Sequence, residues 1–226
     1  MDGILLVDKP QGFTSHDVVN FIRNRFGIKK AGHAGTLDPM ATGLLVLLIG
    51  NYTKRSNQFL NDDKEYDATM TIGATSDTGD AWGQVRPHDN KAKKIAQKDI
   101  EDIFAGFVGA MDQAVPSYSA KKFKGKKLYE LARKGIEVKL DPKKIVIHSL
   151  RITGISLPEI SFKTSCSKGT YIRQLCIDIG NSLGCGAYLS RLRRTRSGNF
   201  EINEAISIEE LKGMDAQSVK KRLKEL

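Results

Sequence analysis

A single carboxylate stands in a glycine-rich segment, residues 31–50, AGHAGTLDPMATGLLVLLIG. Asp38 lies there between Leu37 and Pro39, and a continuous apolar run, Leu44–Ile49, follows it. Such a run is typical of a buried strand. A carboxylate on a loop at the end of a rigid strand can serve as a nucleophile or a base. An aspartate before a proline is more often a turn former, so the position of Asp38 alone leaves both roles open.

Other kinds of reactive centre are not indicated. The four histidines, His16, His33, His88 and His148, show no metal-ligand spacing, and the acidic residues form no DxD pair. There is also no GxxxxGK[ST] or GxGxxG loop. We therefore expect no metal site and a cofactor-free site built on a carboxylate.

The charge of the chain points to a polyanionic partner. The formal net charge is +10. Residues 119–144 carry nine lysines and one arginine against three carboxylates, and a second basic cluster is RLRRTR at 191–196. Net charge alone is equally compatible with a basic protein that binds no nucleic acid. Clustering of this kind favours RNA or DNA.

The elements expected to position these residues alternate between strands and helices. Strands are expected at 3–7, 44–49, 64–73, 145–157, 159–166, 187–193 and 198–202. Helices are expected after Thr14 or Ser15 with Gly27 as the end, at 98–108, at 128–134, after a Thr170 cap with Gly184 as the end, and from Ser207 onward. A loop is expected at 75–83. This order predicts an α+β fold with a mixed, mostly antiparallel central sheet flanked by helices and loops.

The remaining composition suggests a cytoplasmic protein. No apolar stretch is long enough to span a membrane, and the N-terminus lacks the basic and apolar regions of a signal peptide. Cys166, Cys176 and Cys185 have no CxxC spacing. We expect free thiols, no membrane partner and a reducing compartment.

Several ordered blocks of the sequence resemble the TruB-type tRNA pseudouridine synthases. The most specific block is GHAGTLDPMATG at 32–43. The others extend in order from Gly3 to about Phe200: GILLVDKPQGFTSHDVV from Gly3, KEY at 64–66, SDTGD at 76–80, PSYSAKK at 116–122, YELARKG at 129–135, SKGTYIR at 167–173 and LSRLRRTRSG at 189–198.

The resemblance implies the pseudouridine synthase fold and the isomerisation of uridine to pseudouridine at position 55, in the T-loop of tRNA. It implies that Asp38 is the essential carboxylate, with three alternatives for its step: attack on C1′, attack on the base, or removal of a 2′ proton. It also implies that Arg173 pairs with Asp38, which would fix its rotamer and favour its charged form. The alternative for Arg173 is a surface ion pair with Asp178.

The same resemblance assigns residues that handle the flipped base. Tyr66 would stack on the base, Tyr171 and Leu192 would complete the pocket, and His33 would fill the gap left in the RNA. A core aromatic is the alternative for Tyr66, because it alternates with Met70 and Ile72, and a loop hydrogen bond is the alternative for His33. The residues expected to contact the RNA backbone are Lys9, Lys64, Lys121, Lys122, Lys124, Lys126, Lys127, Arg191, Arg193 and Arg194.

The expected organisation is a catalytic domain at 1–202, with a basic RNA-gripping flap at 116–144, followed by a short helical tail at 203–226. That tail is too short for the C-terminal PUA domain of many family members. The expected partner is the T-arm of tRNA, bound by a monomer. Two other functions stay open: a tRNA-binding folding chaperone with secondary or no catalysis, and a guide-RNA-dependent synthase subunit, which the missing PUA domain and the intact flap disfavour.

Overall fold

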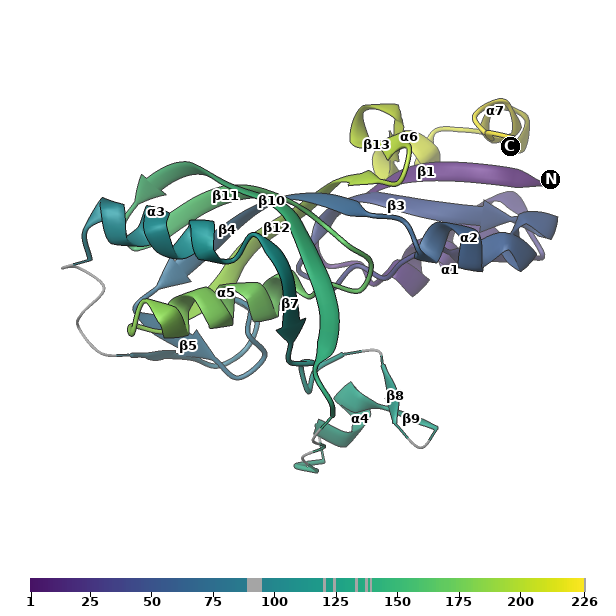
Figure 1. Cartoon of the computed structure of the whole chain (residues 1–226). Helices are drawn as coiled ribbons and strands as arrows, with labels where there is room; N and C mark the ends of the chain where they lie inside the picture. The colour runs from purple at the N-terminus through teal and green to yellow at the C-terminus, as the bar shows by residue number, and fades with distance from the viewer. Residues whose placement is uncertain are drawn as a thin grey trace. The chain divides into compact units, whose positions relative to one another are not determined.

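The computed structural model describes residues 1–88, 95–119, 121–123, 125–132, 134–136, 138 and 140–225. The chain forms two compact units: unit 1 comprises Met1–Asp67 and Leu192–Leu226, and unit 2 comprises Ala68–Arg191. The division falls within two strands, β4 (Lys64–Ile72) and β12 (Ala187–Ser197). Each unit is therefore built on strands, as the labels in Figure 1 allow the reader to follow.

Unit 1 begins with the elements that frame the Asp38 loop. Its elements are β1 (Gly3–Lys9), α1 (Ser15–Phe26), β2 (Ala31–His33), β3 (Thr42–Ile49), the 3₁₀ helix η1 (Gly50–Arg55), α2 (Ser56–Leu60), β13 (Phe200–Glu201), η3 (Ile202–Glu204), β14 (Ile206–Ser207), α6 (Ile208–Lys212) and α7 (Ala216–Lys221). The strands pair in the order β14-β1-β3, and β12 joins β3 in parallel at Arg194 and Gly43.

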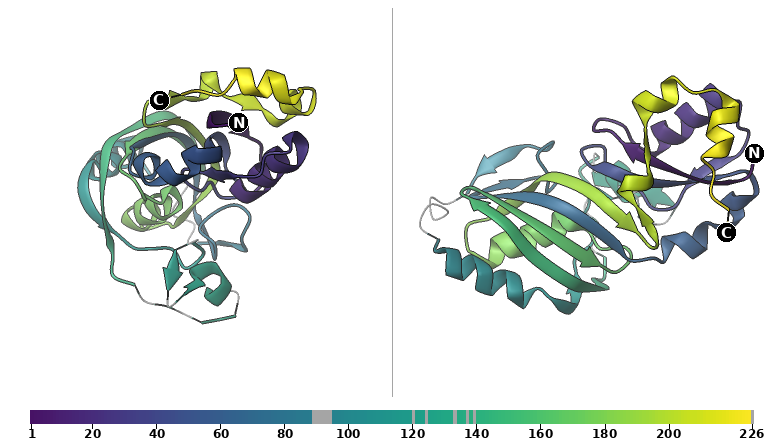
Figure 2. Two further views of the ribbon diagram at one scale, coloured as in Figure 1. Left: turned by 90° about the vertical axis from the view of Figure 1, so that its right-hand side faces the viewer. Right: turned by 90° about the horizontal axis from the view of Figure 1, so that it is seen from above.

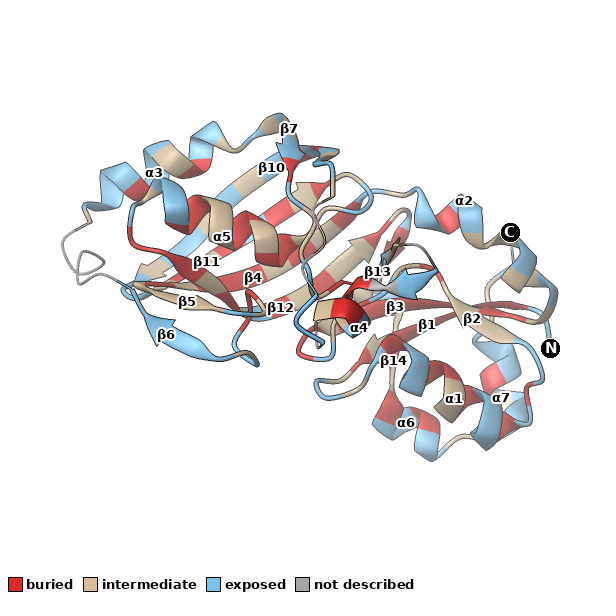
Figure 3. Ribbon diagram, turned by 90° about the horizontal axis from the view of Figure 1, so that it is seen from below, coloured by how far each residue is buried: buried red, intermediate tan, exposed pale blue. Residues whose placement is uncertain are grey.

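The sheet of unit 1 is buried on both faces. Alternate residues of β1 and β3 pack against α1, α6 and α7, and the intervening residues pack against Phe59 of α2 and Phe200. Figure 3 shows β1 and β3 as largely buried strands with α1 and α6 beside them. Because both faces are covered, Leu44–Ile49 reads as an unbroken apolar run rather than an alternating one. The predicted buried strand is confirmed.

Helix α1 begins and ends where its sequence predicts. Thr14 and Asp17 form a capping box, and Gly27 takes a left-handed conformation with a φ of 63°. The C-terminal segment is more than a helical tail, because β14 pairs with β1 and both Leu211 and Val219 lie in the core. In Figure 2 these C-terminal elements, in yellow, lie beside the purple N-terminal strand.

Unit 2 contains a second group of strands and two longer helices. Its elements are β5 (Ala74–Ser76), β6 (Val85–Pro87), α3 (Gln97–Gly106), β7 (Gly109–Gln113), β8 (Lys122–Phe123), β9 (Lys126–Lys127), α4 (Leu128–Ala132), β10 (Lys143–Ser156), β11 (Glu159–Cys166) and α5 (Ile172–Ser182). The strand order is β12-β4-β11-β10-β7. Phe104 of α3 contacts Phe162 of β11, with ring centroids 5.6 Å apart.

Three local expectations differ from the structure. Tyr171, not Thr170, is the N-cap residue of α5, since the Thr170 hydroxyl donates to Ser167 O instead. The predicted strand at 187–193 continues to Ser197, and the one at 198–202 shrinks to β13. The predicted loop at 75–83 is flanked by a small hairpin of β5 and β6. Each difference depends on a partner distant in sequence, which local patterns do not reveal.

The fold class is confirmed: helices accompany a large, mainly antiparallel sheet. The elements β8, β9 and α4 of the predicted flap project beyond the ends of β7 and β10 (Figure 1). No helix among the described residues is long and apolar enough to cross a membrane.

Candidate active site

The loop that carries Asp38 is tied down on both sides of that residue. Leu37 N donates to Ser15 Oγ at 2.8 Å, and the same hydroxyl donates to Leu37 O at 3.2 Å. Gly12 N donates to Pro39 O at 2.9 Å. Leu37 is itself buried, whereas Asp38 is partly exposed. The carboxylate is therefore presented by a fixed backbone, as a reacting group requires.

Arg194 supports the same loop from below. Its side chain is fully buried, with Nε donating to Leu44 O at 2.7 Å and Nη2 donating to Gly35 O at 3.2 Å. The close approach needs a glycine at position 43, whose φ is +100°. A Cβ there would lie 2.3 Å from Arg194 O. The expectation that glycines in this segment permit close backbone approach is confirmed at Gly43.

Lys9 adds a second buried cation. Its ammonium donates to Phe13 O at 2.7 Å and to Pro10 O at 3.0 Å, and the residue has no exposed surface. Burial lowers the pKa of Lys9 to about 8, while the negative charge of Asp38 acts in the opposite direction. Lys9 thus contributes a positive field to Asp38 from inside the protein.

His33, at the end of β2, holds a nitrogen in reserve. Its Nδ1 is buried and has no hydrogen-bond partner among the described residues. Burial lowers its pKa, and the charges of Arg194 and His16 lower it further. His33 is therefore neutral near pH 7 and able to form one donor and one acceptor hydrogen bond.

Tyr66 in β4 and Leu192 in β12 are the two base-pocket candidates of unit 1. Each is 9% exposed. Burial of this extent fits an apolar wall with a small open face, and it fits a core position equally well. Their predicted roles stay predictions.

Arg173, the second residue of α5, is held rigidly within unit 2. Nη1 donates to Thr78 O at 2.8 Å and Nη2 to Tyr118 O at 2.9 Å. Its Nε lies 3.7 Å from Asp80 Oδ2, and the Arg173 side chain is only 4% exposed. The surface pairing with Asp178 is wrong, because Arg173 is buried and Asp178 accepts from Gln174 at 2.8 Å. Arg173 and Asp38 belong to different units, and their pairing stays a prediction.

Two residues around Arg173 were not predicted. The Asp80 carboxylate accepts from Thr78 Oγ1 at 2.8 Å and from Trp82 N at 3.0 Å, which orients it toward Arg173. The Gln113 side chain forms two hydrogen bonds with the main chain of Tyr171. The block SDTGD contains Asp80 and was a signal for it, whereas nothing in the local pattern distinguishes Gln113.

Several expected RNA-backbone residues face the protein instead. Lys64 is 6% exposed, and its ammonium donates to carbonyl oxygens of Phe59, Leu60 and Asp62. Lys9 and Arg194 are buried on carbonyl oxygens in the same way. The difference arises because their partners come from distant turns. We do not carry Lys9, Lys64 and Arg194 forward as RNA contacts.

Arg191 and Arg193 remain accessible but are paired with carboxylates. Arg193 forms a two-point pair with Asp8 at 2.6 and 3.1 Å, and its side chain is 42% exposed. Arg191 lies 3.1 Å from Glu159 and is 72% exposed. A phosphate would have to compete with these carboxylates.

The lysines of the flap are described only in part. Lys121 and Lys126 are exposed, and Lys122 and Lys127 lie in the paired strands β8 and β9. Lys124 lies outside the described residues. Their predicted contacts with RNA stay predictions.

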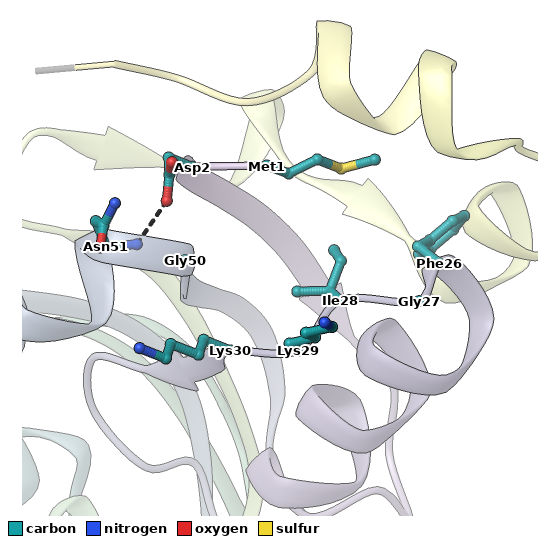
Figure 4. Close-up of a pocket in the computed structure, with 9 residues that line it drawn as sticks. All are labelled: Met1, Asp2, Phe26, Gly27, Ile28, Lys29, Lys30, Gly50 and Asn51. Atoms are coloured by element: carbon teal, nitrogen blue, oxygen red, sulfur yellow. Dashed lines mark hydrogen bonds between the residues drawn. The ribbon is translucent and has the colours of Figure 1, made fainter.

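A cavity elsewhere in unit 1 has a volume of about 530 Å³ (Figure 4). It is lined by Met1, Asp2, Phe26, Gly27, Ile28, Lys29, Lys30, Gly50 and Asn51. None of the predicted site residues lines it. Within the described part of the chain, no group of three or more His, Cys, Asp or Glu side chains is arranged to hold a metal ion.

Comparison with known protein families decides the relationship. Residues 23–172 match the model of the TruB family pseudouridylate synthase N-terminal domain, and residues 173–226 match that of the tRNA pseudouridylate synthase B C-terminal domain. The chain belongs to the TruB family. The resemblance drawn from the sequence blocks is confirmed.

Relatives within the TruB family cover nearly the whole chain. The tRNA pseudouridine synthase B of Syntrophotalea carbinolica is 47% identical over 95% of this chain and 70% of its own length. That of Opitutus terrae is 43% identical over 99% of this chain and 92% of its own length. A crystal structure of a Cbf5–Nop10–Gar1 complex contains a similar chain, with a TM-score of 0.75 and 28% identity, over 98% of this chain and 59% of that one.

Proposed function

We propose that this TruB-family chain isomerises uridine to pseudouridine at position 55, in the T-loop of tRNA. The observation that carries the proposal is the match of two adjacent TruB family models over residues 23–226. The relatives named tRNA pseudouridine synthase B support tRNA as the substrate. A chaperone without catalysis is not favoured, because the family is one of synthases.

The reaction needs a carboxylate and no redox partner. The bond from C1′ to N1 of uracil breaks, the base rotates, and C5 bonds to C1′ while the C5 proton leaves and N1 gains one. No electrons are gained or lost overall, which agrees with a cofactor-free enzyme. Asp38 is the reacting carboxylate in this proposal, and its fixed loop supports the role by limiting the orientations of the group.

Arg173 is proposed to face Asp38 during the reaction. Its guanidinium is already held by two carbonyl oxygens and the Asp80 carboxylate within unit 2. A cation fixed in this way would position Asp38 without needing to reorganise. The proposal for the pair rests on the family resemblance.

The RNA is proposed to bind with the target base flipped. Extrusion of a stacked base costs a few kcal/mol, and stacking on Tyr66 would offset about 1–3 kcal/mol of it. Tyr171 and Leu192 would close the pocket, and the unpaired Nδ1 of His33 would meet the RNA. Exposed Lys121 and Lys126, with Lys122, Lys124, Lys127, Arg191 and Arg193, would contact the backbone.

We further propose a cytoplasmic monomer that acts on tRNA without a guide RNA. One experiment tests the function: purified protein is incubated with unmodified tRNA, and pseudouridine is mapped by carbodiimide-dependent stops of reverse transcription. We expect a stop at the T-loop uridine with the native protein and none with Asp38→Asn.

Three other outcomes would contradict parts of the proposal. tRNA binding without product would favour a chaperone. Product that appears only with an added guide RNA would favour a guide-dependent subunit. Undiminished product with Asp38→Asn would remove Asp38 from the chemistry.

A further inference from the structure

A buried amide side chain in unit 2 holds the main chain just before Arg173. Gln113, the last residue of β7, is 1% exposed. Its Nε2 donates to Tyr171 O at 3.0 Å, and its Oε1 accepts from Tyr171 N at 2.8 Å. One planar amide thus satisfies both polar groups of one residue, as a neighbouring strand would.

This contact replaces an ordinary helix cap. Tyr171 is the N-cap residue of α5, has an extended conformation with φ of −98° and ψ of 107°, and makes no side-chain cap of its own. Tyr171 O also accepts the first helical hydrogen bond, from Leu175 N at 3.1 Å. The direction in which α5 begins is therefore fixed by Gln113 and by the helix together.

The same two chain segments meet a second time at Arg173. Five residues after Gln113, Tyr118 O accepts from Arg173 Nη2 at 2.9 Å. Two residues after Tyr171, the Arg173 guanidinium depends on that carbonyl and on Thr78 O. If the main chain at Tyr171 shifts, Arg173 must leave one of these fixed acceptors, because both belong to other segments of unit 2.

We propose that Gln113 is a positioning residue that holds the main chain of Tyr171 and thereby sets the places of the Tyr171 ring and the Arg173 guanidinium for the isomerisation. The inference rests on the proposed function. Gln113 bonds to the protein main chain, and it acts through Tyr171 and Arg173. A displacement of about 1 Å in groups of this kind is enough to slow a reaction by two orders of magnitude.

The test replaces Gln113 by Met, which has a similar length and no amide. We expect the single-turnover rate of pseudouridine formation to fall about 10- to 100-fold, since two buried main-chain groups lose a partner. The affinity for tRNA should stay within about twofold. Hydrogen exchange at the Tyr171 amide should become faster in the free protein, a readout that needs no activity.

Gln97→Met is the matched control, because the Gln97 amide is exposed and bonds to Glu101 within α3. Its rate and exchange at Tyr171 should equal those of the native protein. If Gln113→Met does not fold, Gln113→Glu, which keeps the acceptor for Tyr171 N, is measured instead, and the same split between rate and affinity is expected.

A folded variant with the native rate would overturn the inference, and so would equal losses in rate and affinity. Failure of the proposed function is distinguishable from this, since the native protein would then give no pseudouridine at all. In that case, unchanged exchange at the Tyr171 amide in the variant would still overturn the positioning role.

Discussion

Neighbouring arginines of one basic cluster have opposite environments. Arg194 is fully buried on two carbonyl oxygens of the Asp38 loop, whereas the Arg191 side chain is 72% exposed and pairs with Glu159. Burial of a guanidinium is tolerated only where acceptors are already in place. The sequence RLRRTR suggests one phosphate-binding surface, but at residue scale it contains a structural support and a solvent-exposed cation.

We expect Arg194→Met to lower the free energy of unfolding by about 2–4 kcal/mol, because two carbonyl oxygens lose a charged donor inside the protein. Its rate of pseudouridine formation should fall as the Asp38 loop loosens. Urea denaturation and single-turnover kinetics on the folded fraction measure the two effects.

Arg191→Met is the control, and it should change stability by no more than about 1 kcal/mol, as for other exposed ion pairs. Equal destabilisation by the two substitutions would contradict the supporting role of Arg194.

The element that presents Asp38 works because two strands approach unusually closely. β3 and β12 pair in parallel at Gly43 and Arg194, and the turn between β2 and β3 closes over that contact. The turn is fixed at its other side by Ser15, next to the cap of α1. The position of the carboxylate is therefore a joint property of β3, β12 and α1.

We expect Gly43→Ala to destabilise the protein by about 3 kcal/mol or more, since the new methyl group would meet the main chain of Arg194 and the backbone already has a positive φ. Thermal and urea denaturation measure the loss.

Gly27→Ala provides the comparison, because Gly27 also has a positive φ but no atom lies within 4 Å of its added Cβ. We expect a cost of about 1 kcal/mol there. A mild effect at Gly43 would mean that β12 can move away from β3 at little cost.

Charge is the property that the whole molecule brings to the reaction. The net charge of +10 is concentrated in residues 119–144, where nine lysines and one arginine face three carboxylates. Binding of a phosphate polymer to such a segment releases counterions, and affinity then falls as salt rises. The basic segment should determine affinity, while Asp38 and its supports determine rate.

We expect simultaneous neutralisation of Lys121, Lys122, Lys124, Lys126 and Lys127 by Gln to weaken tRNA binding. The slope of log affinity against log salt should become shallower by up to about 4. Filter binding across a series of potassium chloride concentrations measures it.

A second variant controls for net charge. It neutralises five exposed lysines outside the segment: Lys98, Lys163, Lys168, Lys212 and Lys220. The slope of this variant should stay close to the native one. If both variants flatten the slope equally, net charge rather than the flap governs binding.

Local information in the sequence determined much of the fold. Alternation, apolar runs and helix caps depend on neighbours along the chain, and they predicted β1, α1, β3, β4, β10 and β11 and the mixed, mostly antiparallel class. Ordered sequence blocks gave the family, and with it Asp38 as the candidate carboxylate. These are features that a residue's near neighbours specify.

The tertiary structure decided which side chains support that carboxylate and which face solvent. Gln113 reaches Tyr171 across 58 residues, Arg173 reaches Thr78 across 95, and Arg194 reaches Gly35 across 159. A lysine or arginine in sequence has the same charge whether it binds phosphate or a buried carbonyl, so Lys9, Lys64 and Arg194 could not be assigned without the fold. Long-range main-chain acceptors, which leave no pattern in the sequence, made the difference.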